Sequence, residues 1–169
     1  MIAWIQSLVP IFKALHIAGL SIWVGGLLTL PLILSRHQPA VVAHEYKLMR
    51  RAVHLIYTGT TGAAVITVIA GTWLIFMQGV FMPWLYAKLA FVALLVAAHG
   101  WIGHVLVKIA EEPGVSKSPR SIPMLVAVGL PALAILLLVL SKPPLPWAVI
   151  PDWLHEPRGG HLPFEVPRR

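Results

Sequence analysis

The sequence contains no cysteine, and this absence excludes disulfides, thiolate zinc sites, iron–sulfur clusters and thiol catalysis. Acidic residues are also scarce, with 6 Asp and Glu against 13 Lys and Arg, and charged residues make up only 11% of the chain. By contrast, 58% of the 169 residues are hydrophobic. This composition is typical of membrane proteins and not of soluble domains.

Four long apolar runs occupy residues 8–34, 52–79, 84–110 and 121–141. Each is long enough to cross a bilayer, which takes about 20 apolar residues. The sequence therefore predicts an all-α fold, an integral membrane four-helix bundle over residues 1–143, followed by a Pro-rich tail over 144–169. The N-terminus lacks the basic start of a signal peptide, so we expect the first run to be retained as a helix.

The distribution of charge predicts the topology. The connections 35–51 and 108–120 are basic, whereas the connection 79–83 has no charge. The positive-inside rule then places the basic connections in the cytoplasm, and both termini and the tail in the periplasm. We expect a multi-pass protein of the bacterial inner (cytoplasmic) membrane. Its net charge of +7 is interpreted as contact with membrane lipid and not nucleic acid, because the basic residues lack interleaved aromatics.

Ionisable residues inside apolar runs are costly, so they are candidates for function. They are Lys13, His16, His54, Lys88, His99 and His104. His16 lies about two helical turns inside the first run, and Lys88 lies at a similar depth in the third. His99 follows Lys88 by eleven residues, close to three turns, on the same helix face. An outer cluster of His16 and Lys88, with His99 as a further member, is therefore predicted.

A second, inner cluster is predicted from His54 and His104, assisted by Tyr57. Haem b takes one or two axial ligands, usually His, inside apolar walls, and helical bundles supply such pockets. We expect haem b as cofactor, with His16 and His99 as metal ligands. Aromatic residues at helical positions would form the walls, namely Trp23, Trp73, Phe91 and Trp101. The alternative for each His is a hydrogen-bonded packing role.

Glycines and prolines have a packing interpretation. Gly19, Gly25 and Gly26 in the first run, and Gly59 and Gly62 in the second, would let helices approach closely. Gly71 would admit a macrocycle or a neighbouring helix, and Pro31, Pro123 and Pro131 are expected to kink or end helices.

Four stretches resemble known families. FKALHIAGLSIWVGGLLTLPLIL resembles the first helix of HemJ-type protoporphyrinogen oxidases and of CopD-type copper-resistance proteins, and RRAVHLIYTGTTGAAVITVIAGTWLI resembles the second helix of both. WLYAKLAFVALLVAAHGWIGHVLVKIA is similar to the third HemJ-type helix, and LVLSKP resembles the C-terminal end of that family. The resemblance covers about residues 11–143 and implies a haem-binding bundle in which the family's membrane His and Lys positions are His16, Lys88 and His99.

Two departures from the HemJ-type pattern affect the functional prediction. Leu32 follows Pro31 where that family has Arg, and Gly129 stands where it has an acid. These departures favour a haem-b electron-transfer or accessory subunit of a membrane redox complex, with partner subunits or as a homo-oligomer. On that interpretation little or no protoporphyrinogen oxidase activity is expected. The first alternative is a protoporphyrinogen IX oxidase.

The second alternative is CopD-like copper transport or resistance, with copper in place of haem. Cu(I) prefers Met and Cys ligands, and Met77 and Met82 lie on the predicted outer side. His155 and His161 in the tail would offer an external Cu(II) site. A purely structural accessory subunit, whose histidines only pack, is a further alternative.

Overall fold

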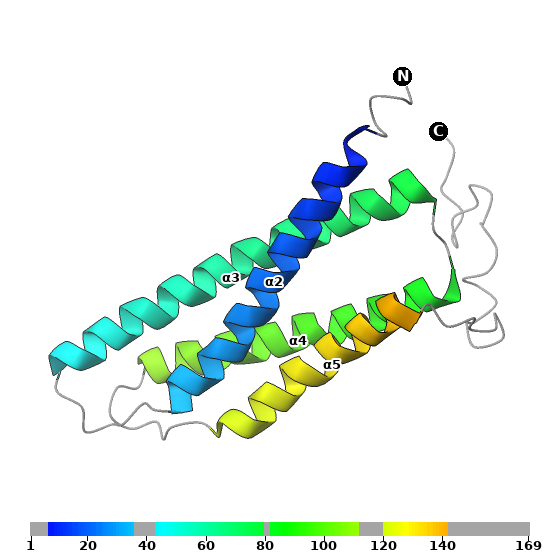
Figure 1. Ribbon diagram of the computed structural model, residues 1–169. Coiled ribbons are helices and arrows are strands. Elements are labelled where there is room, and N and C mark those ends of the chain that lie inside the picture. Colours follow the sequence, from blue (N-terminus) through cyan, green and yellow to red (C-terminus); the bar gives the residue numbers. More distant parts are fainter. Residues whose placement is uncertain (1–6, 36–42, 80–81, 112–119, 142–169) are drawn as a thin grey trace, which may run out of the picture.

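The computed structural model describes residues 7–35, 43–79, 82–111 and 120–141. Within these ranges the chain forms four helices: α2 (Val9–Ser35), α3 (Ala43–Gln78), α4 (Pro83–Glu111) and α5 (Ser121–Ser141). They run alternately up and down, so the C-terminal ends of α2 and α4 lie at the same end of the bundle as the N-terminal ends of α3 and α5 (Figure 1). The predicted all-α four-helix fold is confirmed.

The predicted helix limits were wrong at one place. The segment predicted as the connection 35–51 is helical from Ala43, so α3 begins nine residues before the predicted run at 52. Residues 43–51 contain no Pro or Gly to stop a helix. Lys47, Arg50 and Arg51 therefore project from the first turns of α3, at what we call the basic end of the bundle.

Prolines do not end the helices in which they lie. Pro31 is inside α2 and Pro131 is inside α5, and both are buried. A helix-interior proline loses one backbone hydrogen bond and crowds the preceding turn, and packing against neighbouring helices compensates for this in a bundle. Pro31 and Pro131 were expected to kink or end their helices, and neither of them ends its helix.

Helix α2 packs on α3 through small residues. A side-chain carbon at Gly19 would lie 3.1 Å from the carbonyl oxygen of Ala63, and one at Gly26 would collide with the side chain of Thr60. These two glycines are one heptad apart, so they lie on one face and let the backbones approach. Gly25, Gly59 and Gly62 have open space around them, and close packing predicted there was wrong.

Helices α4 and α5 form the second pair, and α2 also packs on α5. Buried side chains from α2, α4 and α5 share one core, of which the largest are Trp23, Leu27, Leu30, Leu95, Ile102 and Val128. The backbones of α3 and α4 make few close approaches. Polar side chains that connect the helices, and a pocket between α3 and α4, are described below.

The outer faces of the bundle are apolar. Large hydrophobic side chains such as Leu55 and Leu140 are exposed to 74% and 73%, and many others on all four helices are exposed to about half their area. Water would penalise a surface of this kind, whereas lipid tails accommodate it. All four helices are long and apolar enough to span a membrane.

Candidate functional site

His16 on α2 is bound to α3 through one ring nitrogen. Its Nδ1 lies 2.8 Å from the backbone carbonyl oxygen of Thr67. A carbonyl only accepts hydrogen bonds, so Nδ1 carries the hydrogen and Nε2 of the neutral ring keeps its lone pair. A metal-binding histidine commonly has this arrangement, with one nitrogen donating to a carbonyl and the other facing the metal.

The imidazole of His16 fits against α3 because residue 71 is glycine. A side-chain carbon at Gly71 would lie 2.8 Å from Cε1 and 3.0 Å from Nδ1 of His16, closer than atoms pack. The sequence predicted close approach at Gly71, and the structure identifies the approaching group as this imidazole. Every residue has a backbone carbonyl, so the sequence does not indicate that the carbonyl of Thr67 is the one that binds His16.

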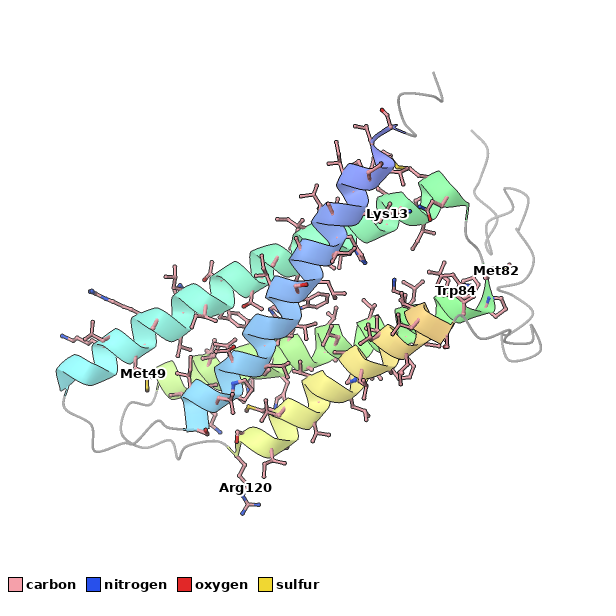
Figure 2. The ribbon with its side chains drawn as sticks, in the orientation of Figure 1. Lys13, Met49, Met82, Trp84 and Arg120 are labelled. Carbon is pink, nitrogen blue, oxygen red and sulfur yellow. The ribbon has the colours of Figure 1, made fainter. Side chains whose placement is uncertain are left out.

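Lys88 on α4 belongs to the same region as His16. It is half-buried, and it lies near enough to His16 for the two side chains to interact electrostatically. The predicted proximity of His16 and Lys88 is therefore present. Lys13, one turn before His16, is exposed on the N-terminal part of α2, at the end of the bundle that also contains Trp84 and Met82 (Figure 2).

His99 lies in a separate polar cluster that joins three helices. Trp23 of α2 donates from Nε1 to Nδ1 of His99, at 2.9 Å. His99 Nε2 lies 3.0 Å from the hydroxyl oxygen of Thr61 on α3, and that hydroxyl donates to the carbonyl of Tyr57 at 2.8 Å. The ring of Tyr57 lies 4.9 Å from the His99 ring, centroid to centroid. We call these four residues the His99 node.

The tautomer of His99 follows from its partners. Indole nitrogen only donates, so Nδ1 of His99 accepts and Nε2 carries the hydrogen, which it donates to Thr61. Both ring nitrogens thus have partners, as in the packing alternative for a membrane histidine. Trp23 is 7 residues after His16, so the node lies about 10 Å further along α2. His99 stays a predicted ligand, but one that would have to release Trp23 first.

Of the residues predicted to form the inner cluster, the structure brings His54 and Tyr57 to one pocket. His54 and His104 are both exposed, and His54 borders a pocket at the basic end together with Tyr57, whereas His104 is not among its lining residues. The hydroxyl of Tyr57 faces Gly103, where a side-chain carbon would collide with it. Tyr57 therefore connects the pocket to the His99 node, a connection that residue spacing alone did not reveal.

Of the four aromatic residues predicted to form the walls of a haem site, two belong to the interior of the bundle and two are exposed. Trp23 is 1% exposed and belongs to the core, and the partly buried Phe91 packs against that core. Trp73 and Trp101 are exposed to 52% and 43%, and Trp73 packs against Phe12. Only Trp23 and Phe91 thus contribute to an interior wall.

No group of three or more His, Asp or Glu able to hold a metal ion occurs in the described parts of the chain. One histidine plus a macrocycle remains compatible with this finding, because a porphyrin supplies the other iron ligands. His37, His155 and His161, and the whole tail from 144, lie outside the described residues.

The chain is similar to a protoporphyrinogen IX oxidase of the cyanobacterium Synechocystis sp., with 34% identity over 111 residues. The alignment covers 59% of this chain and 52% of the relative, so the chain spans about half the length of the relative it matches. No family model and no solved structure matches. The comparison supports the resemblance to HemJ-type oxidases and gives no support to the CopD-type resemblance.

Proposed function

We propose that this chain is a haem-binding membrane oxidoreductase that acts on a tetrapyrrole of the protoporphyrinogen class. The similarity to a protoporphyrinogen IX oxidase supports this reaction class, and supports it better than the electron-transfer role that the sequence departures favoured. The four apolar helices support a membrane location. On the charge distribution we place the protein in the bacterial cytoplasmic membrane with both termini in the periplasm.

The observation that carries the haem assignment is the geometry of His16. Its Nδ1–H is held by the Thr67 carbonyl at 2.8 Å, and its ring is fixed against Gly71. This leaves Nε2 as a preorganised lone pair, which suits haem iron. His16 would hold the group, and a bound haem would supply one-electron redox chemistry.

Lys88 would neutralise a carboxylate of the haem that His16 would hold. An ammonium that is half-buried between helices attracts an anion more strongly than one in water, because the surrounding dielectric is low. It belongs to the His16 region, so the two residues provide a metal ligand and a countercharge from α2 and α4.

The two departures from the family pattern lie away from this region. Leu32 is exposed to 50% on the outer face of α2. Gly129 of α5 has open space where a side chain would begin. Leu32 is sixteen residues after His16 on α2, about 24 Å along the helix, and no atom lies within 4 Å of a side-chain carbon placed at Gly129, so neither residue contacts His16.

A visible spectrum of the purified protein tests the haem assignment. We expect a Soret band and sharp reduced α and β bands that are lost in His16→Ala and retained in His104→Ala, which alters an exposed histidine of α4. Full haem occupancy in an inserted His16→Ala protein would remove His16 as the ligand. Copper without haem would favour the copper alternative.

Complementation tests the reaction. In a bacterial strain that lacks its own protoporphyrinogen oxidases, the parent chain should restore growth without added haem. A haem-loaded protein that fails to restore growth would overturn the oxidase assignment. It would leave the haem-b electron-transfer subunit, which the changes at Leu32 and Gly129 favour, as the better function.

A further inference from the structure

The pocket at the basic end of the bundle has no part in the His16 site. It has a volume of about 550 Å³ and lies between the N-terminal half of α3 and the C-terminal part of α4, with Leu34 of α2 behind it. Tyr57 and Thr67 are ten residues apart, so the pocket lies about 15 Å from the His16 contact along α3. The His99 node occupies the intervening stretch.

Its lining is apolar inside and cationic at the mouth. Leu34, Val53, Leu106 and Ile109 contribute hydrocarbon walls, and Tyr57 packed on Gly103 closes the inner end. Lys47, Arg50 and Arg51 border the exposed side, and no Asp or Glu is among the described lining residues. A ligand that matches this lining has an apolar body and anionic groups at one edge.

The spacing of the basic residues indicates two anionic groups. Lys47 and Arg51 are four residues apart on α3 and form one ridge, while Arg50 and His54 form a second ridge by the same spacing. Arg50 and Arg51 thus present positive charge on two neighbouring ridges, which suits a dicarboxylate, because arginine binds carboxylates through paired hydrogen bonds. A phospholipid headgroup with one phosphate would engage one ridge, and its two acyl chains would extend beyond a 550 Å³ space.

We propose that this pocket binds the tetrapyrrole substrate, with its carboxylates at Arg50 and Arg51 and its ring in the apolar interior against Tyr57. The proposal rests on the proposed function for the identity of the ligand. It assigns the substrate to a site separate from the haem ligand His16, at the opposite end of the His99 node.

Binding of protoporphyrin IX to the haem-loaded protein in phosphatidylcholine nanodiscs tests the site, with porphyrin fluorescence anisotropy as the readout. The double variant R50Q/R51Q should weaken binding about tenfold or more, since two charge-assisted contacts are lost at a partly solvated mouth. The matched control is R120Q, which removes an exposed positive charge at the start of α5, outside the pocket (Figure 2). It should bind porphyrin as the parent does.

The dimethyl ester of protoporphyrin IX separates charge recognition from apolar binding. It should bind the parent and R50Q/R51Q equally, whereas V107W, which fills the pocket from α4 without changing charge, should weaken both ligands. Haem content reports folding and insertion for every variant. Unchanged porphyrin affinity in both R50Q/R51Q and V107W would overturn the proposal.

Two further results keep this proposal distinct from its alternatives. If phosphatidylglycerol copurifies with the parent but not with R50Q/R51Q, and porphyrin binding is the same in both, the site is a lipid site and the proposal is wrong. An active oxidase whose KM is unchanged in R50Q/R51Q would refute the pocket while the proposed function stands. Porphyrin binding that depends on the arginines in a protein without oxidase activity would support the pocket and refute the function.

Discussion

The substitution Gly71→Ala tests whether the glycine exists to hold His16. The added carbon would lie 2.8 Å from Cε1 of the imidazole, and ordinary contact begins at 3.4 Å. The ring must therefore retreat from α3 by at least about 0.6 Å. Because the Nδ1···O distance to Thr67 is now 2.8 Å, the same retreat lengthens it to about 3.4 Å, where a hydrogen bond is weak.

The energetic consequence can be estimated against a matched control. Gly62→Ala lies on the same helix with open space around it, so it should only gain helix propensity, up to about 1 kcal/mol. Gly71→Ala has the same gain but loses the His16 hydrogen bond, about 0.5–1.5 kcal/mol. Gly71→Ala should therefore unfold more easily than Gly62→Ala by about 1 kcal/mol. Loss of the partner that orients a metal ligand should also lower haem affinity about 10- to 100-fold.

The assay is the haem-to-protein ratio after purification in detergent, followed by haem release to an excess of an apoprotein acceptor. Gly71→Ala should lose haem faster than both the parent and Gly62→Ala. Equal haem retention and equal stability in the two alanine variants would refute the reasoning, because the imidazole would then not depend on the glycine. Equal stability with selective haem loss would refute only the energetic part.

Three further predictions concern the His99 node, the pocket and the topology. His99→Leu should lower the free energy of unfolding by about 1–3 kcal/mol, because it leaves the buried Trp23 N–H without its acceptor. The double variant with Trp23→Phe should lose less stability than the sum of the two single variants. Strictly additive free energies of unfolding in detergent would contradict this coupling. Gly103→Ala should displace Tyr57 and weaken porphyrin binding, whereas Gly100→Ala, which has open space on the same helix, should leave porphyrin binding unchanged. Equal porphyrin affinities of the two variants in a titration would contradict the role of the contact between Tyr57 and Gly103. A reporter fused after the last residue should be active in the periplasm, since the short basic connections favour the cytoplasm, and cytoplasmic activity would invert the proposed orientation.

The sequence predicted the helices well because hydrophobic length is a local property. Each of the four runs became a helix within one or two residues of its predicted limits, except the start of α3, where the polar segment from Ala43 continues the helix. Polar residues in this segment indicate where the membrane-spanning part of the helix ends. They do not indicate whether the helix itself ends there. The positions of His16 and Lys88 along their helices also predicted that the two belong to one region, and the structure places them near enough to interact electrostatically.

The partners of each polar group could not be predicted, because they depend on how the helices rotate and cross. Residue spacing grouped His99 with His16, but the crossing of α2 over α3 and α4 gives His99 to Trp23 and Thr61. At the basic end, His54 borders a pocket whose lining does not include His104, and both histidines are exposed. Histidine is recognisable from sequence, but its tautomer and free nitrogen are not.

The sequence by itself thus determined a membrane bundle of four helices, the basic end and the set of ionisable residues inside the apolar runs, since these follow from composition and helical periodicity. Only the tertiary structure decided which of these residues have all their polar atoms in hydrogen bonds, and which keep an atom that can bind a ligand. His16 receives a backbone carbonyl because Gly71 lets α2 and α3 approach, while both nitrogens of His99 are occupied. Hydrogen bonds between helices require atoms within about 3 Å, and no one-dimensional pattern fixes that distance.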